Sequence, residues 1–424
     1  MFQRIRAISI SLPLILLAAL AIRAAFAWTY QAHNAHRGLA AVPFLFESGN
    51  IAYSLARGHG FGSPLRIDTG PTAWMTPLYP LLLAGIMRAF GIYTFHSWAA
   101  AVTLNVCFSA LVCLPLYFAG KRIGGPALGA AAAWLWAVFP NAILLSFQSL
   151  WDTSLSALLG ATALWATLRL AGSTRRRDWI LYGLLWGLIL MANAAVLSLL
   201  PPLLGWAVYR TWQARLPYTR SAALALTVVF LCCLPWTVRN YLTFHSLVPL
   251  RSTLGLQLWV GNNPEAHPIW LGENHPINDA SERRQYIELG EIAYMAAKRR
   301  DAVNYIFTHP AHEAQLISSR FVMFWSGGSL NPRSDLVNNH SAWFRFVLLF
   351  NLAAAVGTLA GIVILIEQRS PYWLPVAAGP IVFPFAYYLT LALPRYRHPI
   401  DPTLMLLLAL ALQTLARGRP ERQQ

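Results

Sequence analysis

An acidic residue stands in the one long polar interruption of the first third of this chain, from Phe44 to Pro80. A helix over residues 44–57 places Glu47 at the edge of an apolar stripe formed by Phe44, Ile51 and Leu55. A carboxylate there faces protein or membrane, where it is costly to keep and must be paired or put to use. Two interpretations stay open. Glu47 does acid–base chemistry, or it braces the loop through an ion pair with Arg23 or Arg57.

Cationic side chains gather where apolar segments end. Arg239 follows one such segment, and a group of three precedes another, namely Arg395, Arg397 and His398. This placement has an ordinary explanation in a membrane protein, because Arg side chains extend from a span toward the interface. Several of them nevertheless fall on the side opposite to the basic loops, which favours a role in binding an anion.

Other patterns with known chemistry are absent from the sequence. His33 and His36 are close together, but scattered histidines near membranes are usually structural, and no His, Cys and Asp spacing is that of a metal site. There is no Walker motif, no GxGxxG after a strand and no GxSxG elbow. We therefore expect no bound cofactor or metal, with a divalent metal left open.

The composition is that of a membrane protein. Hydrophobic residues make up 57% of the chain and charged residues only 11%. The net charge of +16 does not indicate a nucleic-acid partner, because Lys and Arg lie mainly in short loops between apolar runs, as the positive-inside rule expects. The 4 cysteines all lie inside apolar runs, so we interpret them as core thiols.

The apolar runs predict a series of membrane helices. In chain order they are Ile8–Trp28, Trp74–Phe90, Trp98–Gly120, Ala127–Leu145, Thr153–Leu170, Trp179–Ala195, Val196–Trp212, Ala222–Trp236, Trp343–Ile366, Tyr372–Leu393 and Pro399–Leu415. We interpret the first as a retained helix and not a signal peptide cleaved near Ala27, because Arg23 breaks the cleavage region. Arg23 is expected to reach the outer interface or to pair with a loop carboxylate.

The positions of the basic loops indicate whether the second apolar run, Trp74–Phe90, crosses the membrane. Lys121–Arg122 and Arg175–Arg177 should both be cytoplasmic, and they are so only if Trp74–Phe90 does not cross the membrane. Its prolines also suit a juxtamembrane helix. The chain is then expected to have about ten spans with both termini inside. The expected regions are a transmembrane catalytic region over 1–238, with a first periplasmic loop at 31–73 and a juxtamembrane segment at 74–91, a periplasmic cap at 239–340, and C-terminal transmembrane helices at 341–424.

Residues 239–340 are too long and polar for an ordinary connection. Alternation of Leu with smaller or polar residues over Leu254–Leu258 is a weak strand signal. Helical patterns follow over Ser281–Tyr305 and Ala311–Trp325. A small extracytoplasmic cap made mainly of helices is the simplest interpretation.

Two stretches resemble the membrane glycosyltransferases with the GT-C fold, above all the bacterial relatives of protein O-mannosyltransferases and of the aminoarabinose transferases that modify lipid A. In the first loop of those enzymes an acidic residue precedes a helix of the form A-x-x-L-x-x-G and a P-L-Y-P segment. These places are filled here by Glu47, Ala52, Leu55, Gly58 and Pro77–Leu78–Tyr79–Pro80. The run PWTVRNY…GLQLWVGNNP, residues 235–264, resembles a second stretch of those transferases. The sequence departs from the pattern in having Glu where Asp is commoner, and Met75–Thr76 where a His or Lys is usual.

The resemblance implies an all-α integral membrane protein, a GT-C-type polytopic helical bundle with extracytoplasmic loop helices and a small periplasmic cap. It implies inverting transfer of a sugar from a polyprenyl-phosphate donor to a lipid, glycan or protein acceptor, on the periplasmic face of a bacterial inner membrane. Glu47 would be the general base. Asp152 would be a second acid that positions acceptor or metal, with a helix N-cap as its alternative role. The leaving phosphate would be held by cationic side chains, the candidates being Arg239, Arg397, Arg395 and His398.

Two other classes of protein fit parts of the sequence. A polytopic transporter or lipid flippase would carry ionisable groups near the middle of the membrane, whereas the charges here gather at the rim of the spans. A polysaccharide polymerase or ligase would share the outward-facing site but would use diphosphate-linked glycans. Turnover of a polyprenyl-phosphate sugar separates these alternatives.

Overall fold

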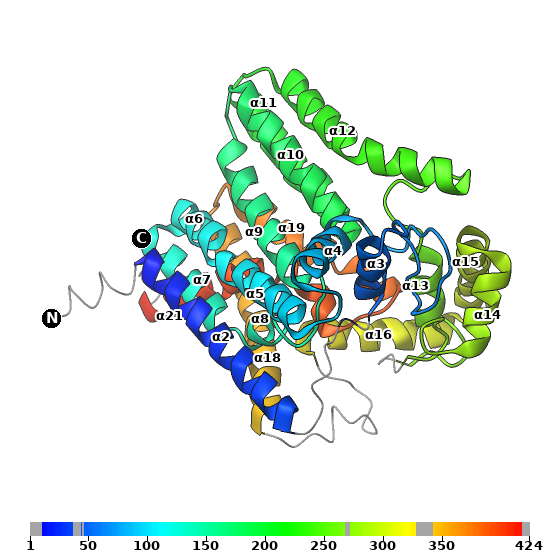
Figure 1. Cartoon of the computed structure of the whole chain (residues 1–424). Coiled ribbons are helices and arrows are strands. Elements are labelled where there is room, and N and C mark those ends of the chain that lie inside the picture. Colours follow the sequence, from blue (N-terminus) through cyan, green and yellow to red (C-terminus); the bar gives the residue numbers. More distant parts are fainter. Residues whose placement is uncertain (1–10, 37–43, 45, 268–271, 328–341, 418–424) are drawn as a thin grey trace.

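The computed structural model describes residues 11–36, 44, 46–267, 272–327 and 342–417 (Figure 1). Within these ranges every regular element is a helix, apart from one isolated bridge between Gly62 and Pro71. The all-α prediction is therefore confirmed for this part of the chain. Parts of the predicted first loop and cap, the side chain of His36 and the tail beyond Arg417 lie outside the described residues.

The first half of the chain supplies most of the helical bundle. Its helices are α2 (Leu12–His36), α3 (Glu47–Ala56), α4 (Leu78–Phe90), α5 (Phe95–Leu111), α6 (Cys113–Gly124), α7 (Pro126–Val138), α8 (Pro140–Leu144), α9 (Thr153–Leu170), α10 (Arg176–Ala192), the 3₁₀ helix η1 (Ala194–Leu199), α11 (Leu200–Gln213) and α12 (Tyr218–Phe244). Pro126 and Pro140 begin α7 and α8, a position where the missing N–H costs no intrahelical bond.

The second half forms the cap and returns to the bundle. Its helices are α13 (Leu254–Gly261), α14 (Ala280–Leu289), α15 (Glu291–Thr308), α16 (Pro310–Ser326), α18 (Ala342–Glu367), α19 (Trp373–Val382), α20 (Phe385–Leu389), the 3₁₀ helix η2 (Pro394–Arg397) and α21 (Asp401–Arg417). In Figure 1, α14 and α15 lie at the right of the molecule, away from α2, α6 and α7 at the left.

Several described helices can cross a membrane. By length and composition four are long and apolar enough, namely Leu12–His33, Phe95–Gly124, Tyr218–Phe244 and Phe344–Glu367. Shorter apolar helices of the described residues are Leu78–Phe90, Pro126–Val138 and Trp373–Leu389. The chain is a multi-pass membrane protein, while its number of spans stays a prediction.

Small residues allow α10 and α12 to approach each other closely. Gly183 and Gly187 are one turn apart on α10 and face α12. A Cβ atom added at Gly183 would lie 2.7 Å from the carbonyl oxygen of Ala225, and one added at Gly187 would lie 2.4 Å from the Cβ of Cys232. This is the small-xxx-small pattern by which helices associate in lipid, where no hydrophobic effect draws them together.

The bundle has two chemically different ends. The Asn193 side chain, after α10, donates to the Asp152 carboxylate, before α9, at 2.9 Å, so these two helix ends lie together. With 18 residues in α9 and 17 in α10, each helix runs about 25 Å away from that point. The connection that carries Arg175–Arg177 therefore lies at the opposite end of the bundle. Polar residues of the cap and first loop gather at the Asp152 end.

The short helix α4 stays at the Asp152 end. Thr76, just before α4, donates to the carbonyl oxygen of Ala192 at 2.9 Å. Arg88, in the last turn of α4, donates to the carbonyl oxygen of Leu55 in the first loop at 2.7 Å. Both ends of α4 thus contact elements on one side of the bundle. That this segment is juxtamembrane and does not cross the membrane stays a prediction.

Some predicted elements were wrong in type or extent. Leu254–Leu258 belongs to α13 and is not a strand, because Leu256 and Val260, one helical turn apart, are the buried side chains. The helix predicted over Ser281–Tyr305 is divided at Gly290, whose φ of +74° ends α14. The span predicted over Tyr372–Leu393 is likewise broken and leaves helical geometry after α20.

The position of the Arg23 side chain also differs from the prediction. Arg23 neither reaches the interface nor pairs with a loop carboxylate, since its side chain is fully buried in the bundle. Its guanidinium donates to the carbonyl oxygens of Trp136 and Ala137, both at 3.1 Å, and to the hydroxyl of Ser109 at 2.8 Å. These carbonyls lie at the end of α7, where helix carbonyls run short of donors. The carbonyl of Trp136 also accepts from the backbone N–H of Phe139 at 3.2 Å, and Arg23 supplies further donors inside the bundle.

Candidate active site

A cavity of about 540 Å³ opens at the Asp152 end of the bundle. Its walls come from the first loop, the adjoining ends of α9 and α10, the segment between α12 and α13, the turn before α14, and the connection from α20 to α21. Segments far apart in sequence thus bring their polar side chains together. Those that could bind or react are Glu47, Asp152, Asn193, Arg251, His275 and Arg395.

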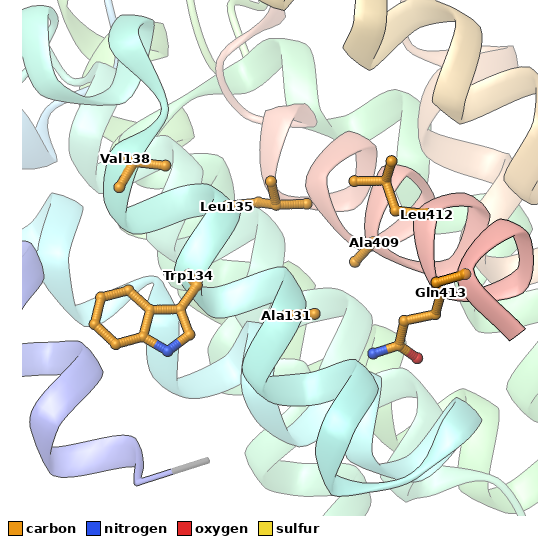
Figure 2. Close-up of a pocket in the computed structure, with 8 residues that line it drawn as sticks. Ala131, Trp134, Leu135, Val138, Ala409, Leu412 and Gln413 are labelled. Atoms are coloured by element: carbon orange, nitrogen blue, oxygen red, sulfur yellow. The ribbon is translucent and has the colours of Figure 1, made fainter. Parts of the chain in front are cut away.

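A second cavity, of about 370 Å³, lies between α7 and α21 in the apolar bundle (Figure 2). Its lining is aliphatic and aromatic except for Gln413. It has no ionisable side chain that could transfer a proton or bind a phosphate. The polar cavity is therefore the candidate active site.

Glu47 is the first residue of α3 and lines this cavity, with its side chain 22% exposed. The predicted apolar stripe holds α3 in place, because Phe44 and Ile51 are buried in the protein interior. Neither arginine named as an alternative partner pairs with Glu47 among the described residues. Its ion-pair neighbour is instead His275, whose Nε2 lies 3.7 Å from Oε1 of Glu47.

The geometry around His275 fixes the tautomer of its ring. Nδ1 accepts a hydrogen bond from the backbone N–H of Ile277 at 3.2 Å, so the proton of the neutral ring sits on Nε2 and faces Glu47. Burial lowers the pKa of His275, which favours the neutral ring. Beside a neutral His275 the Glu47 carboxylate can act as a proton acceptor.

Asp152 lies in the same cavity and is held by two neighbours. Its Oδ2 accepts from Ser156 Oγ and from Asn193 Nδ2, both at 2.9 Å. Its side chain makes no capping hydrogen bond to the backbone of α9, so no such bond supports the alternative role of Asp152 as an N-cap. Removal from solvent raises the pKa of Asp152, and the bond from Ser156 opposes that change. Two acids predicted from sequence thus share one site.

Two arginines supply its positive charge. The Arg395 guanidinium carbon lies 3.6 Å from the ring centre of Trp151 and 5.1 Å from that of Tyr396, so the group is stacked and half-buried. Arg251 lines the cavity from the segment that follows α12 and is exposed. Neither takes part in an ion pair in the described part of the chain. Arg395 was predicted, whereas Arg251 and His275 were missed.

The other predicted cations do not line this cavity. Arg239 lies within α12, which continues beyond the predicted end of that span, and it donates to the carbonyl oxygens of Thr72 at 2.7 Å and Phe61 at 2.8 Å. Arg397 is buried and donates to Asp401 Oδ1 at 2.6 Å. These two guanidinium groups join segments of the fold, and their role in binding the donor phosphate stays a prediction.

His398 is also placed away from the cavity. It is fully buried, and its Nδ1 lies 3.0 Å from Oδ2 of Asp401, the same carboxylate that binds Arg397. Asp401 is thus part of a buried ionic group at the start of α21. No group of three His, Cys, Asp or Glu side chains that could hold a metal ion is found within the described ranges. A divalent metal therefore stays an open expectation from the sequence.

Comparison with known proteins gives a consistent picture of the fold. Residues 74–238 match the family described as dolichyl-phosphate-mannose-protein mannosyltransferase. No curated protein matches the chain. The apo oligosaccharyltransferase of Archaeoglobus fulgidus is similar over 94% of this chain and 50% of that chain, with a TM-score of 0.55 and 13% identity.

The same archaeal enzyme, AglB, in complex with an inhibitory peptide and a dolichol-phosphate is similar over 88% of this chain and 46% of that chain, with a TM-score of 0.52 and 13% identity. This chain therefore spans half or less of the length of those chains. At such identity the likeness concerns the fold, and the predicted GT-C fold is confirmed.

Proposed function

We propose that this chain, a membrane protein with the GT-C fold of membrane glycosyltransferases, transfers a sugar from a polyprenyl-phosphate donor to an acceptor bound in the polar cavity. The observation that carries the proposal is the content of that cavity. One wall has the Glu47 carboxylate, whose ion-pair neighbour among the described residues is the buried His275 at 3.7 Å. Another has two guanidinium groups, Arg251 and Arg395, which form no ion pair within the described ranges. A base and an anion site in one cavity are what this reaction requires.

The charge balance of the reaction suits the two arginines. A sugar linked to polyprenyl phosphate is a phosphodiester with one negative charge, and the departing phosphate monoester gains a second as the sugar–oxygen bond breaks. Preorganised cations near that oxygen stabilise the developing charge. The phosphate leaves readily by itself, so the protein need not supply a general acid.

The acceptor side of the reaction needs a base. An acceptor hydroxyl becomes a good nucleophile when a carboxylate takes its proton during attack, and we assign this task to Glu47. We propose inversion at the sugar carbon, with the base on the face opposite to the phosphate, by analogy with inverting glycosidases. Asp152, with Oδ2 already bonded to Ser156 and Asn193, would orient a hydroxyl of the acceptor or the sugar through its other oxygen.

The donor class is tested by offering alternatives to the purified protein in detergent. A panel of polyprenyl-phosphate sugars, with an extract of envelope lipids and glycans as acceptor, should yield free polyprenyl phosphate. The corresponding nucleotide sugars should be left intact. Release of a nucleotide diphosphate from a nucleotide sugar, with no polyprenyl phosphate present, would overturn the proposal. Consumption of only diphosphate-linked glycans would favour a polymerase or ligase.

The side of the membrane is tested by cysteine labelling. We propose that the cavity faces the periplasm of a bacterial inner membrane, because the basic α9–α10 connection lies at the opposite end of the bundle. In a variant without native cysteines, single cysteines at the exposed positions His59 and Gln285 should react with an impermeant maleimide in intact spheroplasts. A cysteine at Thr174 should react only after lysis. Labelling of Thr174→Cys before lysis would contradict this orientation.

A further inference from the structure

We propose that Glu291 is a positioning residue, which fixes Arg251 and Trp74 at the wall of the cavity and thereby sets the affinity for the phosphate of the lipid. This inference rests on the proposed function. Glu291 itself does not line the cavity, so it would act entirely through the segments that it binds. Those are the chain around Thr72 in the first loop and the chain around Ser252 after α12.

The Glu291 carboxylate is the meeting point of four donors. It lies in the first turn of α15 with a residue exposure of 6%. Its Oε1 accepts from the backbone N–H of Ala73 at 2.8 Å and from Ser252 Oγ at 2.7 Å. Its Oε2 accepts from Tyr286 OH at 2.8 Å and from Thr72 Oγ1. A buried charge is tolerable here because neutral donors and the helix N-terminus compensate it.

The two clamped segments also bind each other. The backbone N–H of Ser252 donates to the carbonyl oxygen of Ala73 at 2.9 Å, and Thr253 Oγ1 donates to that of Trp74 at 3.2 Å. Arg251 and Trp74 belong to these two segments and line the cavity. Their backbone positions therefore depend on the same carboxylate. Among the described residues no hydrogen bond or ion pair holds the exposed Arg251 side chain.

The catalytic carboxylate is held by different contacts. Glu47 belongs to α3, whose Ser48 donates to the carbonyl oxygen of Leu150 at 3.1 Å, and the preceding Phe44 is buried in the core of the bundle. Loss of the Glu291 clamp should therefore loosen the phosphate side of the cavity and leave Glu47 in place. A positioning role predicts weaker lipid binding with little change in turnover at saturating donor. General destabilisation of the fold predicts no such split.

Glu291→Gln is the direct test, because it keeps the size of the side chain but cannot accept four hydrogen bonds. The dissociation constant for polyprenyl phosphate, measured by intrinsic tryptophan fluorescence in detergent, should rise about tenfold. The apparent KM for the donor should rise in parallel, with kcat within about twofold of the parent. Ser252→Ala, which removes one donor only, should show the same change to a smaller degree, even if Glu291→Gln fails to fold.

Glu282→Gln is the matched control. Glu282 is a buried cap acid with 8% exposure that accepts from Tyr294 OH and Lys298 Nζ, both at 2.6 Å, and it bonds to no cavity segment. Its variant should bind polyprenyl phosphate like the parent, whatever its thermal stability. An equal loss of binding in both variants would show that Glu291 acts only on stability and would overturn the inference.

A double-mutant cycle tests whether Glu291 acts through the arginine. Arg251→Ala alone and Arg251→Ala with Glu291→Gln should bind polyprenyl phosphate with nearly the same affinity. Additive losses would overturn the inference. The two proposals fail in different ways: a parent protein that binds no polyprenyl phosphate contradicts the proposed function, whereas a parent that binds it and a Glu291→Gln variant that binds it equally contradict only the role of Glu291.

Discussion

Replacement of Glu47 by Gln is expected to lower sugar transfer by about a hundredfold or more. Gln has nearly the size and hydrogen-bonding capacity of Glu but cannot take a proton from the acceptor hydroxyl. Binding of polyprenyl phosphate should be unchanged, because the arginines lie on other segments of the cavity wall. The measurement compares initial rates of transfer at saturating donor and the dissociation constant for polyprenyl phosphate in the same preparations.

Two further variants separate the base from a structural role. Glu47→Asp keeps the proton acceptor but shortens its reach by one methylene, so partial activity is expected. In Glu47→Ala, azide should restore turnover of the donor, because an anionic nucleophile needs no deprotonation. The exposed Glu288→Gln serves as the matched surface control. If Glu47→Gln transfers sugar at the parental rate, the residue only braces α3.

The three cavity residues that sequence reasoning found share one property. Asp152 and Arg395 each stand beside a long apolar run, and Glu47 stands at the edge of an apolar stripe, so each charged side chain departs from the pattern around it. The two missed residues, Arg251 and His275, lie within the polar segment before and after α13. Charged and polar residues are ordinary there, so nothing local distinguishes them. Only the packing of the cap against the first loop brings them to the cavity.

The misplaced arginines show a second limit of sequence reasoning. Arg23 was expected to reach the interface or to pair with a loop carboxylate, and Arg397 to bind the donor phosphate or to extend toward the interface, because each lies near the end of an apolar run. The structure instead binds Arg23 to carbonyls at the end of α7 and Arg397 to the Asp401 carboxylate. Which helix ends adjoin an arginine depends on how the bundle packs. Hydrophobic periodicity predicts the helical bundle, but it does not predict these contacts.

The other large effect is expected for Arg395. Arg395→Ala should lower kcat/KM for the lipid donor by about a hundredfold, since it removes a cation that faces developing charge. Arg395→Lys should restore only part of that loss. A lysine keeps the charge but loses the planar guanidinium that stacks 3.6 Å from the ring centre of Trp151 and can bind two phosphate oxygens at once. The exposed Arg284→Ala is the matched control and should match the parent.

The charge of each ligand decides whether Arg395 acts in the way proposed. The donor phosphodiester carries one negative charge, whereas the transition state approaches the two of the free phosphate. Arg395→Ala should therefore weaken inhibition by polyprenyl phosphate more than it raises the KM for the donor, and it should lower kcat. A variant in which only the donor KM rises would mean that Arg395 binds substrate and transition state equally. A variant with parental kinetics would mean that its stacking on Trp151 is structural, which would leave Arg251 as the cation of the cavity for the leaving phosphate.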